Sequence, residues 1–430
     1  MSEQASASEV IHAPRRDTMQ DNSTKSAKDS ALDAIRAAVV LTKDAVNAVS
    51  VTAMDALRQA LELINIKPET DVTNPFEDLE ARIWEQEPPL ELIDMAYKYC
   101  EDLTLREAGN FYHSFKYLPI EQRRAMCAIY AFCRRADDIV DGDWIDSFPG
   151  GMGQEDPEAI NYRINIEELI GFEHQGEKEV YENKMAQLFF FRKKLSTCYS
   201  DIYSTDPVFL ALKDAVSTYG IPKDYFVELI SGMEDDLFKN RYGSFEELYT
   251  YCYRVASVVG LMCIEIYGFK DQNAKKYAES WGIFMQLTNV MRDVGEDIER
   301  DRVYLPLDEL EELGITIDEL SGSVQKNLEW EKYVVRYAKR TREYLKDGRR
   351  LLGCLPRRSR YSPAAMIAFY DRILKQIVKR QGDVFSQRVK LNKFQKLWLA
   401  AAVYIRYRFL PRFLTPAWDL VATVGLLPKV

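Results

Sequence analysis

Two groups of aspartates, far apart in the chain, are the residues whose types and spacing could do chemistry. The first group contains Asp137 and Asp141, and the second contains Asp293 and Asp297. Carboxylates four residues apart lie on the same side of a helix, about 6 Å along its axis, so each pair can present oxygen ligands to one divalent cation. Two such sites facing each other across a cavity would hold diphosphate groups through magnesium.

The residues around both groups indicate buried helices. Residues 125–133 are apolar and lead directly into the first group, which is typical of a core helix. The second group continues a polar stripe on an otherwise apolar helix, made of Gln286, Asn289, Asp293 and Asp297. An acidic string alone is often only a solvated helix face. A buried polar stripe is costly without partners, so it favours a ligand, a metal or a water-filled cavity over a structural network.

Composition limits the function classes. With 430 residues, 47% of them hydrophobic, the chain can bury one large helical domain. A net charge of −10 argues against nucleic acid as the main partner, and a diphosphate substrate would require metal and local arginines. The seven cysteines lack CxxC spacing and indicate reduced thiols in a cytosolic protein, and three histidines do not favour a zinc site.

Composition, apolar spacing and prolines predict the organisation of the first 89 residues. We expect a disordered tail at residues 1–30, an amphipathic helix at 31–66 and a Pro-containing linker at 67–89. Helix 31–66 could pack on its own domain, on a partner helix or on a membrane surface. The tail has no apolar core of a secretory signal, and no run of eighteen apolar residues predicts a spanning helix. The protein is expected to be cytoplasmic, and either soluble or peripheral on a membrane.

The rest of the chain should be all-α. Apolar residues recur every three to four positions over residues 90–390, which predicts long helices around a central cavity. Residues 142–179 are rich in Gly, Pro, Asp and Glu and predict an insertion, either a gate over the cavity or a plain solvated loop. The basic and aromatic residues of 391–430 suit either a helix at an anionic membrane or a helix that closes the core.

Four strings in this domain closely resemble the squalene/phytoene synthase family, the head-to-head prenyl synthases: residues 110–119, 122–141, 251–260 and 286–306. The resemblance implies an all-α isoprenoid synthase bundle that joins two allylic diphosphates through a cyclopropylcarbinyl diphosphate into a linear hydrocarbon. The chain is most similar to the phytoene-forming members, which condense two geranylgeranyl diphosphates and lose a proton without NADPH. The alternative is a squalene or dehydrosqualene synthase that uses farnesyl diphosphate.

The resemblance also implies roles for single residues. The metal-binding and catalytic aspartates are Asp137, Asp141, Asp293 and Asp297, which would hold Mg²⁺ or Mn²⁺, with Asp138 and Glu296 in support. The expected diphosphate ligands are Arg134, Arg292 and Arg302. A planar guanidinium grips phosphate oxygens bidentately, although a salt bridge to the adjacent carboxylates is the rival interpretation of each arginine.

Further positions match the family's substrate cavity. Aromatic rings that stabilise a carbocation are expected at Tyr130, Tyr251, Tyr304 and Tyr370, of which Tyr304 is also expected to be catalytic. Ordinary core tyrosines are equally compatible with the sequence. Ala256, Val259 and Gly260 are small residues against which a prenyl tail could lie, or sites of close helix packing. The remaining matched polar positions are Gln286, Asn289, Asp236 and Arg388.

Two other function classes fit less well. A non-catalytic scaffold with the same fold predicts eroded carboxylates, whereas both groups are intact. A terpene cyclase predicts a second motif of Asn, Ser and Glu, and residues 289–297 lack that placement of Ser and Glu.

Overall fold

The computed structural model describes residues 87–142, 175–322 and 327–408. The chain divides into two compact units, Met1–Ile66 and Lys67–Val430, and all described residues belong to the second. The predicted tail, helix 31–66, most of the linker and most of the insertion therefore lie outside the described residues. The first described helix begins at Leu90, where the main domain was predicted to begin. A helix already begins at Gln175, inside the stretch expected to be a loop.

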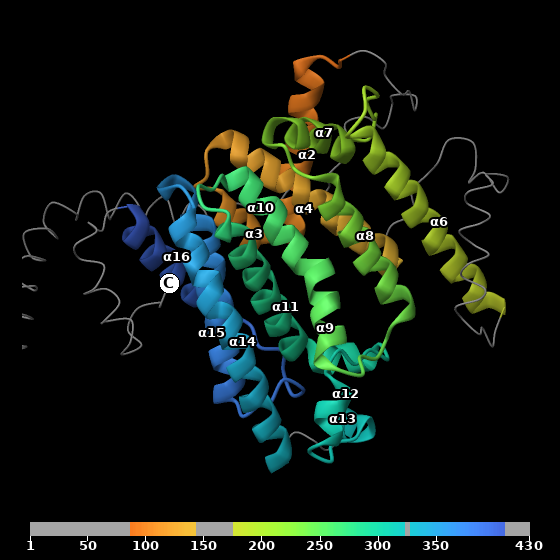
Figure 1. The fold of residues 1–430 in the computed structure, drawn as a ribbon, viewed down its shortest axis with the longest axis vertical. Helices are drawn as coiled ribbons and strands as arrows, with labels where there is room; N and C mark the ends of the chain where they lie inside the picture. The colour runs from red at the N-terminus through yellow and green to blue at the C-terminus, as the bar shows by residue number, and fades with distance from the viewer. Residues whose placement is uncertain (1–86, 143–174, 323–326, 409–430) are drawn as a thin grey trace, which may run out of the picture. The chain divides into compact units, whose positions relative to one another are not determined.

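The described part of the chain is helical, which confirms the predicted fold class (Figure 1). Its elements are α2 (Leu90–Glu107), α3 (Gly109–Phe115), α4 (Ile120–Asp141), α6 (Gln175–Thr197), α7 (Pro207–Tyr219), α8 (Lys223–Phe238), α9 (Phe245–Cys252), η1 (Tyr253–Ser257), α10 (Val258–Tyr267), α11 (Asn273–Glu299), α12 (Leu307–Glu311), α13 (Ile317–Gly322), α14 (Leu328–Cys354), η3 (Arg357–Ser359), α15 (Tyr361–Lys379) and α16 (Lys393–Arg408). An isolated β-bridge joins Arg241 and Val303. None of these helices is long and apolar enough to cross a membrane.

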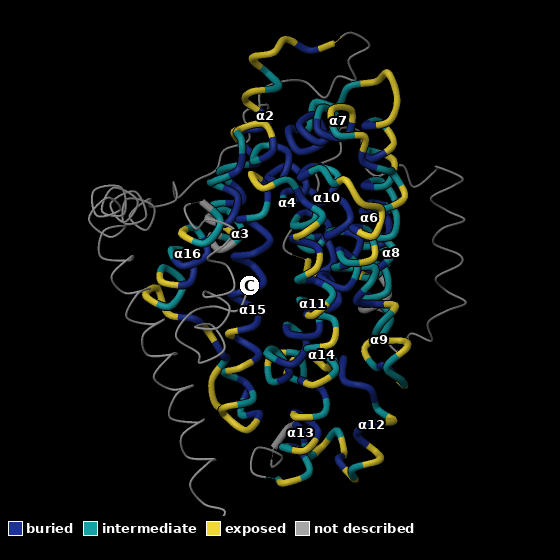
Figure 2. The backbone as a smooth tube through the Cα atoms, turned by 60° about the vertical axis from the view of Figure 1, so that its left-hand side comes forward, coloured by how far each residue is buried: buried dark blue, intermediate teal, exposed yellow. Residues whose placement is uncertain are grey.

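Helices α4 and α11, which carry the two aspartate groups, lie at the centre of the packing. Helix α4 packs against α2, α7, α8 and α10, and α11 packs against α10, α14, α15 and η1. Within the described residues, α4 and α11 form no packed interface with each other. Figure 2 shows that the buried backbone follows α4, α10 and α15. The two aspartate groups are therefore held on separate helices of the core.

The end of α4 is closed by a glycine and a lysine. Gly142 follows Asp141 in the left-handed conformation, with φ at 86°, and its amide donates to the carbonyl of Asp138 at 3.0 Å. The Nζ atom of Lys184, from α6, donates to the carbonyl of Val140 at 2.6 Å. A cation at a helix C-terminus satisfies open carbonyls and complements the helix dipole. These contacts fix the last turn of α4 and therefore Asp141.

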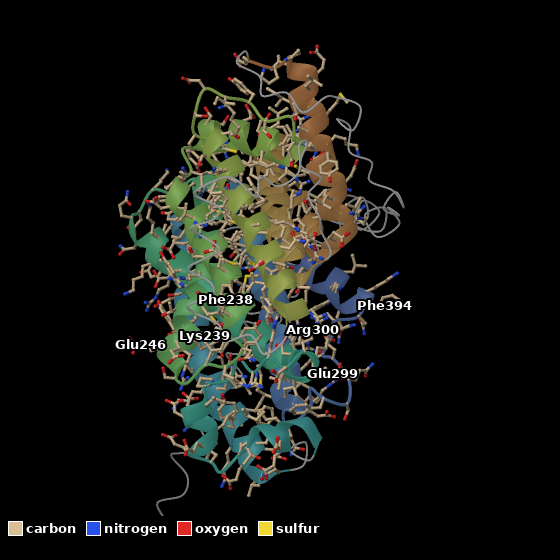
Figure 3. The ribbon with its side chains drawn as sticks, turned by 90° about the vertical axis from the view of Figure 1, so that its right-hand side faces the viewer. Phe238, Lys239, Glu246, Glu299, Arg300 and Phe394 are labelled. Carbon is tan, nitrogen blue, oxygen red and sulfur yellow. The ribbon has the colours of Figure 1, made fainter. Side chains whose placement is uncertain are left out.

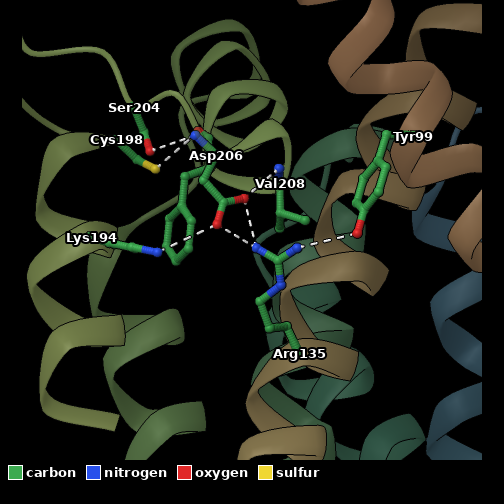
Figure 4. A network of polar contacts seen from close by, with 8 residues as sticks. Tyr99, Arg135, Lys194, Cys198, Ser204, Asp206 and Val208 are labelled. Atoms are coloured by element: carbon green, nitrogen blue, oxygen red, sulfur yellow. Dashed lines mark hydrogen bonds and ion pairs between the residues drawn. The ribbon is translucent and has the colours of Figure 1, made fainter. Parts of the chain in front are cut away.

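A buried ion pair ties α4 to α6 and α7 (Figure 4). Arg135 donates through Nη1 to both oxygens of Asp206, at 2.6 and 2.5 Å, and through Nη2 to the hydroxyl of Tyr99 at 3.4 Å. Lys194 of α6 lies 3.5 Å from the same carboxylate. Asp206 also caps α7, because its Oδ1 accepts from the amide of Val208 at 2.9 Å. The network holds α4 at the residue that directly follows Arg134.

A π-helix interrupts the run from α9 into α10. The helix η1 packs so closely on α11 that a Cβ atom on Gly282 would lie 2.4 Å from the Cα of Ser257. A Cβ on Gly232 of α8 would lie 2.8 Å from the side chain of Val255. Ser257 also donates to the carbonyl of Glu279 at 2.9 Å. Such π-turns occur often at functional sites, and this one carries the predicted substrate-binding residue Ala256.

Candidate active site

The first aspartate group is paired with the arginine one turn before it. Arg134 forms an ion pair through Nη2 with Asp138, and its Nη1 lies 3.5 Å from Oδ2 of Asp137. Burial and the negative charge of Asp141 raise the pKa of Asp137 to about 6, although Arg134 and Arg302 oppose this rise. Arg134 therefore compensates Asp138 best, and the charge of Asp137 and Asp141 is left largely open to another cation.

The second group is compensated differently. Asp293 accepts from Arg292 at 2.7 Å through Nε and 2.5 Å through Nη2, and from Nε of Arg388 at 2.8 Å. Arg388 also lies 3.2 Å from the carboxylate of Glu296. Burial and the charge of Asp293 raise the pKa of Asp297 to about 7. Each group thus contains one carboxylate whose pKa is raised.

Arg302 connects the two groups. Its Nη1 lies 3.9 Å from Oδ1 of Asp141, and its positive charge lowers the pKa values of both Asp137 and Asp297 against the effect of burial. Its own amide donates to the carbonyl of Asp297 at 2.8 Å. Arg302 therefore lies beside both groups, with its guanidinium near Asp141 of α4 and its backbone amide bonded to Asp297 of α11.

Asp236 of α8 holds two tyrosines. Its Oδ2 accepts from the hydroxyl of Tyr251 at 2.9 Å, and its Oδ1 accepts from that of Tyr304 at 3.0 Å. The two rings are stacked, with centroids 5.0 Å apart. Burial raises the pKa of Asp236 to about 7, although Arg302 and the two hydroxyls oppose this rise. Three positions predicted separately thus form one hydrogen-bonded unit.

Sequence reasoning missed a third tyrosine of this unit. The ring of Tyr242 lies 5.5 Å from that of Tyr304 and 5.3 Å from that of Tyr251. Lys239 stands 4.9 Å from its centroid. The buried hydroxyl of Tyr242 has no hydrogen-bond partner among the described residues. In the sequence, Tyr242 precedes Gly243 and looks only like the edge of a turn, so no local signal identifies it.

Further predicted polar residues gather between α11 and α15. Asn289 donates through Nδ2 to Oε1 of Gln286 at 3.2 Å. Burial raises the pKa of the Tyr370 phenol, and the neighbouring Arg292 and Asn289 oppose the rise. The structure therefore places these four residues together, beside the Arg292 contact to Asp293.

The predicted apolar positions lie on faces that solvent partly reaches. Tyr130 is partly accessible and its ring centroid lies 5.9 Å from that of Phe111. Ala256 and Val259 are also partly accessible, whereas Gly260 is buried, and a Cβ on it would lie 2.8 Å from the carbonyl oxygen of Ala278. Gly260 therefore serves close helix packing.

The residues present fit a divalent metal. Their donors are carboxylate oxygens, the ligands that Mg²⁺ and Mn²⁺ prefer, and the like charges within each pair call for a cation. Over the described ranges, no group of three or more His, Cys, Asp or Glu side chains forms a site for a metal ion. Magnesium commonly binds through one or two carboxylates and completes its shell with substrate phosphates and water. Paired aspartates are thus sufficient on the protein side.

Comparison with known proteins agrees with this chemistry. Residues 105–395 match the sequence profile of the family described as squalene/phytoene synthase. The chain is 32% identical to phytoene synthase 1 of Zea mays, over 77% of this chain and 74% of that protein. It is 32% identical to the phytoene synthase of Mycobacterium tuberculosis, over 72% and 91%, and 31% identical to the 15-cis-phytoene synthase of Synechococcus elongatus, over 71% and 91%.

Solved structures give the same fold. A dehydrosqualene synthase superposes with a TM-score of 0.60 at 23% identity, covering 74% of this chain and 98% of that one. A squalene synthase from Alicyclobacillus acidocaldarius superposes with a TM-score of 0.55 at 25% identity, covering 69% and 97%. Fold and site together define an all-α isoprenoid synthase, an enzyme of the prenyltransferase class. The chain belongs to the squalene/phytoene synthase family.

Proposed function

We propose that this enzyme condenses two geranylgeranyl diphosphates head to head, through a cyclopropylcarbinyl diphosphate, into phytoene and releases diphosphate. The observation that carries the proposal is identity of 31–32% to several proteins named phytoene synthase, over 71–77% of the chain. The position of Arg302 supports it, since its guanidinium lies near Asp141 and its amide is bonded to Asp297, and two substrates require two diphosphate sites close together.

The charged residues of the site would bind the metal ions and the diphosphate groups. Asp137 and Asp141 would hold Mg²⁺ on one side, and Asp293 and Asp297 on the other, with Mn²⁺ as a substitute. Bound metal ions would neutralise the negative charge of the leaving diphosphate. Arg302, beside both groups, is suited to grip phosphate oxygens with its planar guanidinium. Arg134, Arg292 and Arg388, now paired with carboxylates, would share those bonds with phosphate.

The tyrosines would stabilise the carbocation. Tyr251 and Tyr304 donate their hydroxyl hydrogens to Asp236, which fixes the orientation of both rings. A fixed ring face stabilises positive charge through its quadrupole and does not react. Tyr130, Ala256 and Val259 supply further wall for the prenyl chains. Because the reaction ends by loss of a proton, it needs no hydride from NADPH.

A product assay tests the proposal. Purified protein is incubated with Mg²⁺ and either geranylgeranyl or farnesyl diphosphate, without NADPH, and the hydrocarbon is identified by mass spectrometry. We expect phytoene from geranylgeranyl diphosphate. A C30 product from farnesyl diphosphate, with none from geranylgeranyl diphosphate, would overturn the proposal in favour of a squalene or dehydrosqualene synthase.

We also propose that the apolar product leaves toward a membrane beside α16. One face of this helix packs on α15, with Tyr404 against Tyr361. The other exposes Phe394, which is 84% accessible and points outward in Figure 3, together with Trp398 and Ile405. Helical spacing puts these three on one side, next to basic residues. Flotation with anionic vesicles tests this: Phe394→Glu should reduce binding, and equal flotation of both proteins would contradict it.

A further inference from the structure

The turn that leads out of α11 has an unusual backbone. Arg300 is the C-cap residue of α11. The next residue, Asp301, takes the left-handed conformation with φ at 56°. Residues other than glycine rarely adopt it, although aspartate and asparagine tolerate it best. The next residue is Arg302, which connects both aspartate groups. The conformation of Asp301 therefore decides where the Arg302 side chain starts.

A clamp from the end of α8 holds Asp301. Arg241 donates through Nη1 to the backbone carbonyl of Asp301 and forms an ion pair through Nη2 with its Oδ1. Asn240 donates through Nδ2 to Oδ2 of Asp301 at 3.1 Å. Backbone and side chain of one residue are thus held from the same side. Figure 3 labels Lys239 and Arg300, the residues that directly precede Asn240 and Asp301 in the chain.

Backbone hydrogen bonds continue the clamp along the chain. The amide of Val303 donates to the carbonyl of Asn240 at 2.9 Å, and that of Leu307 donates to the carbonyl of Tyr242 at 2.9 Å. Residues 240–243 and 303–308 therefore run together, with Tyr304 stacked on Tyr242. Because Asp236 lies one turn before Lys239, the clamp joins the two segments that meet in the Tyr304 hydrogen bond to Asp236.

We propose that Arg241 is a positioning residue of the diphosphate site: its grip on Asp301 sets the placement of Arg302 and Tyr304. The inference rests on the proposed function, because it takes Arg302 as a diphosphate ligand. Arg241 itself contacts no predicted substrate ligand in the described structure; it acts through Asp301. Lysine cannot replace it, because one ammonium lacks the planar fork that reaches a carbonyl and a carboxylate together.

Because the Asp301 side chain is exposed, a positioning role can be distinguished from a contribution to stability. The Asp301 side chain is 76% accessible, and exposed ion pairs contribute little to folding. If the Arg241–Asp301 pair were only a surface contact, its removal would therefore change neither the melting temperature nor the affinity for diphosphate. A positioning pair would leave the melting temperature almost unchanged and weaken diphosphate binding, because small displacements of a ligand group cost affinity and rate.

The test measures binding of inorganic diphosphate with Mg²⁺ by calorimetry, together with the melting temperature. Arg241→Ala, Arg241→Lys and Asp301→Gly should each weaken diphosphate binding about tenfold, with melting temperatures within about 2 °C of wild type. Glycine accepts the left-handed turn, so Asp301→Gly removes the side-chain contacts to Asn240 and Arg241 and keeps the backbone carbonyl that accepts from Arg241. The double variant Arg241→Ala/Asp301→Gly should bind no more weakly than either single one. The matched control is Arg350→Ala, which removes an exposed ion pair to Asp347 on α14 and should bind normally.

Two further results decide the outcome. Hydrogen exchange at the Val303 amide should accelerate in Arg241→Ala, and unchanged exchange or diphosphate affinity within twofold of wild type would overturn the proposal. Arg302→Gln distinguishes failure of the positioning role of Arg241 from failure of the diphosphate-binding role of Arg302. If Arg302→Gln weakens diphosphate binding while Arg241→Ala does not, the clamp is only a surface contact and the proposed function stands. If Arg302→Gln binds diphosphate normally, the assigned role of Arg302 fails and the positioning role fails with it.

Discussion

Arg388 donates from Nε to Oδ1 of Asp293 at 2.8 Å, although 95 residues separate them in sequence. Arg292 donates to both oxygens of the same carboxylate. Asp293 is therefore compensated by two guanidiniums. Asp137, to which the sequence gives the same role, is not, and burial and Asp141 raise its pKa to about 6. These two predicted metal ligands thus lie in different electrostatic surroundings.

This difference predicts opposite effects of one substitution. Without metal, Asp137→Asn should melt at or above the wild-type temperature, because it removes a disfavoured charge. Asp293→Asn should melt lower, because two arginines lose their partner. Both variants should lose at least about 100-fold in turnover. Calorimetric melting in chelator and a product assay with Mg²⁺ check this. Near-normal activity of either variant, or a reversed order of melting temperatures, would count against it.

The shared acceptor Asp236 predicts non-additive tyrosine variants. Tyr251→Phe and Tyr304→Phe each keep the stacked ring and remove one hydrogen bond to Asp236. Each should lower kcat about tenfold, and the double variant should differ from the product of the two, because both hydroxyls stabilise one carboxylate. Tyr242→Phe is the matched control: its hydroxyl has no partner in the described structure, so its kcat should stay near wild type. Strictly multiplicative losses would argue against a coupled unit.

The sequence predicts those features that repeat along one helix. Spacings of three and four put Asp137 with Asp141, and Gln286 with Asn289, on single faces, and the structure has them there. The start of helix α2 at Leu90 follows from the prolines before it. These features depend on local periodicity and turn chemistry, which a single sequence contains.

Other features depend on contacts between distant segments. Tyr242 and Arg241 gain their roles from backbone pairing between residues 240–243 and 303–308, which have no periodic pattern. The π-helix η1 depends on the close approach of Gly282, some 25 residues further on. The pairing of Arg388 with Asp293 likewise joins separate elements. No propensity or spacing rule identifies such partners before the fold is known.

The Arg135–Asp206 pair predicts acid sensitivity of the fold. Burial alone would raise the pKa of Asp206, but Arg135, Lys194 and the Val208 amide outweigh burial and lower it. An acid with a lowered folded-state pKa stabilises the fold above its unfolded value, about 4, and this stabilisation disappears as pH falls through the folded value.

Asp206→Asn should therefore cost about 3 kcal/mol of unfolding free energy at pH 7, since it leaves Arg135 buried without its anion. Asparagine keeps an oxygen for the Val208 amide, so the helix cap survives. The difference between wild type and variant should shrink as pH falls below about 4. Urea unfolding at several pH values measures it, and a difference that stays constant with pH would exclude the charge as its cause.

The contact between Gly282 and η1 predicts a variant that damages both stability and activity. In Gly282→Ala the new Cβ would meet the backbone of Ser257 at 2.4 Å, so α11 and η1 must separate, at a cost of about 3 kcal/mol. The shift would move Ala256 and lower kcat. Gly353→Ala is the matched control: its Cβ meets nothing within 4 Å in helix α14, so stability should stay equal or rise by up to about 1 kcal/mol. Thermal unfolding and the product assay compare the two. If Gly282→Ala were as stable and active as Gly353→Ala, the close approach of η1 to α11 would not be needed to shape the site.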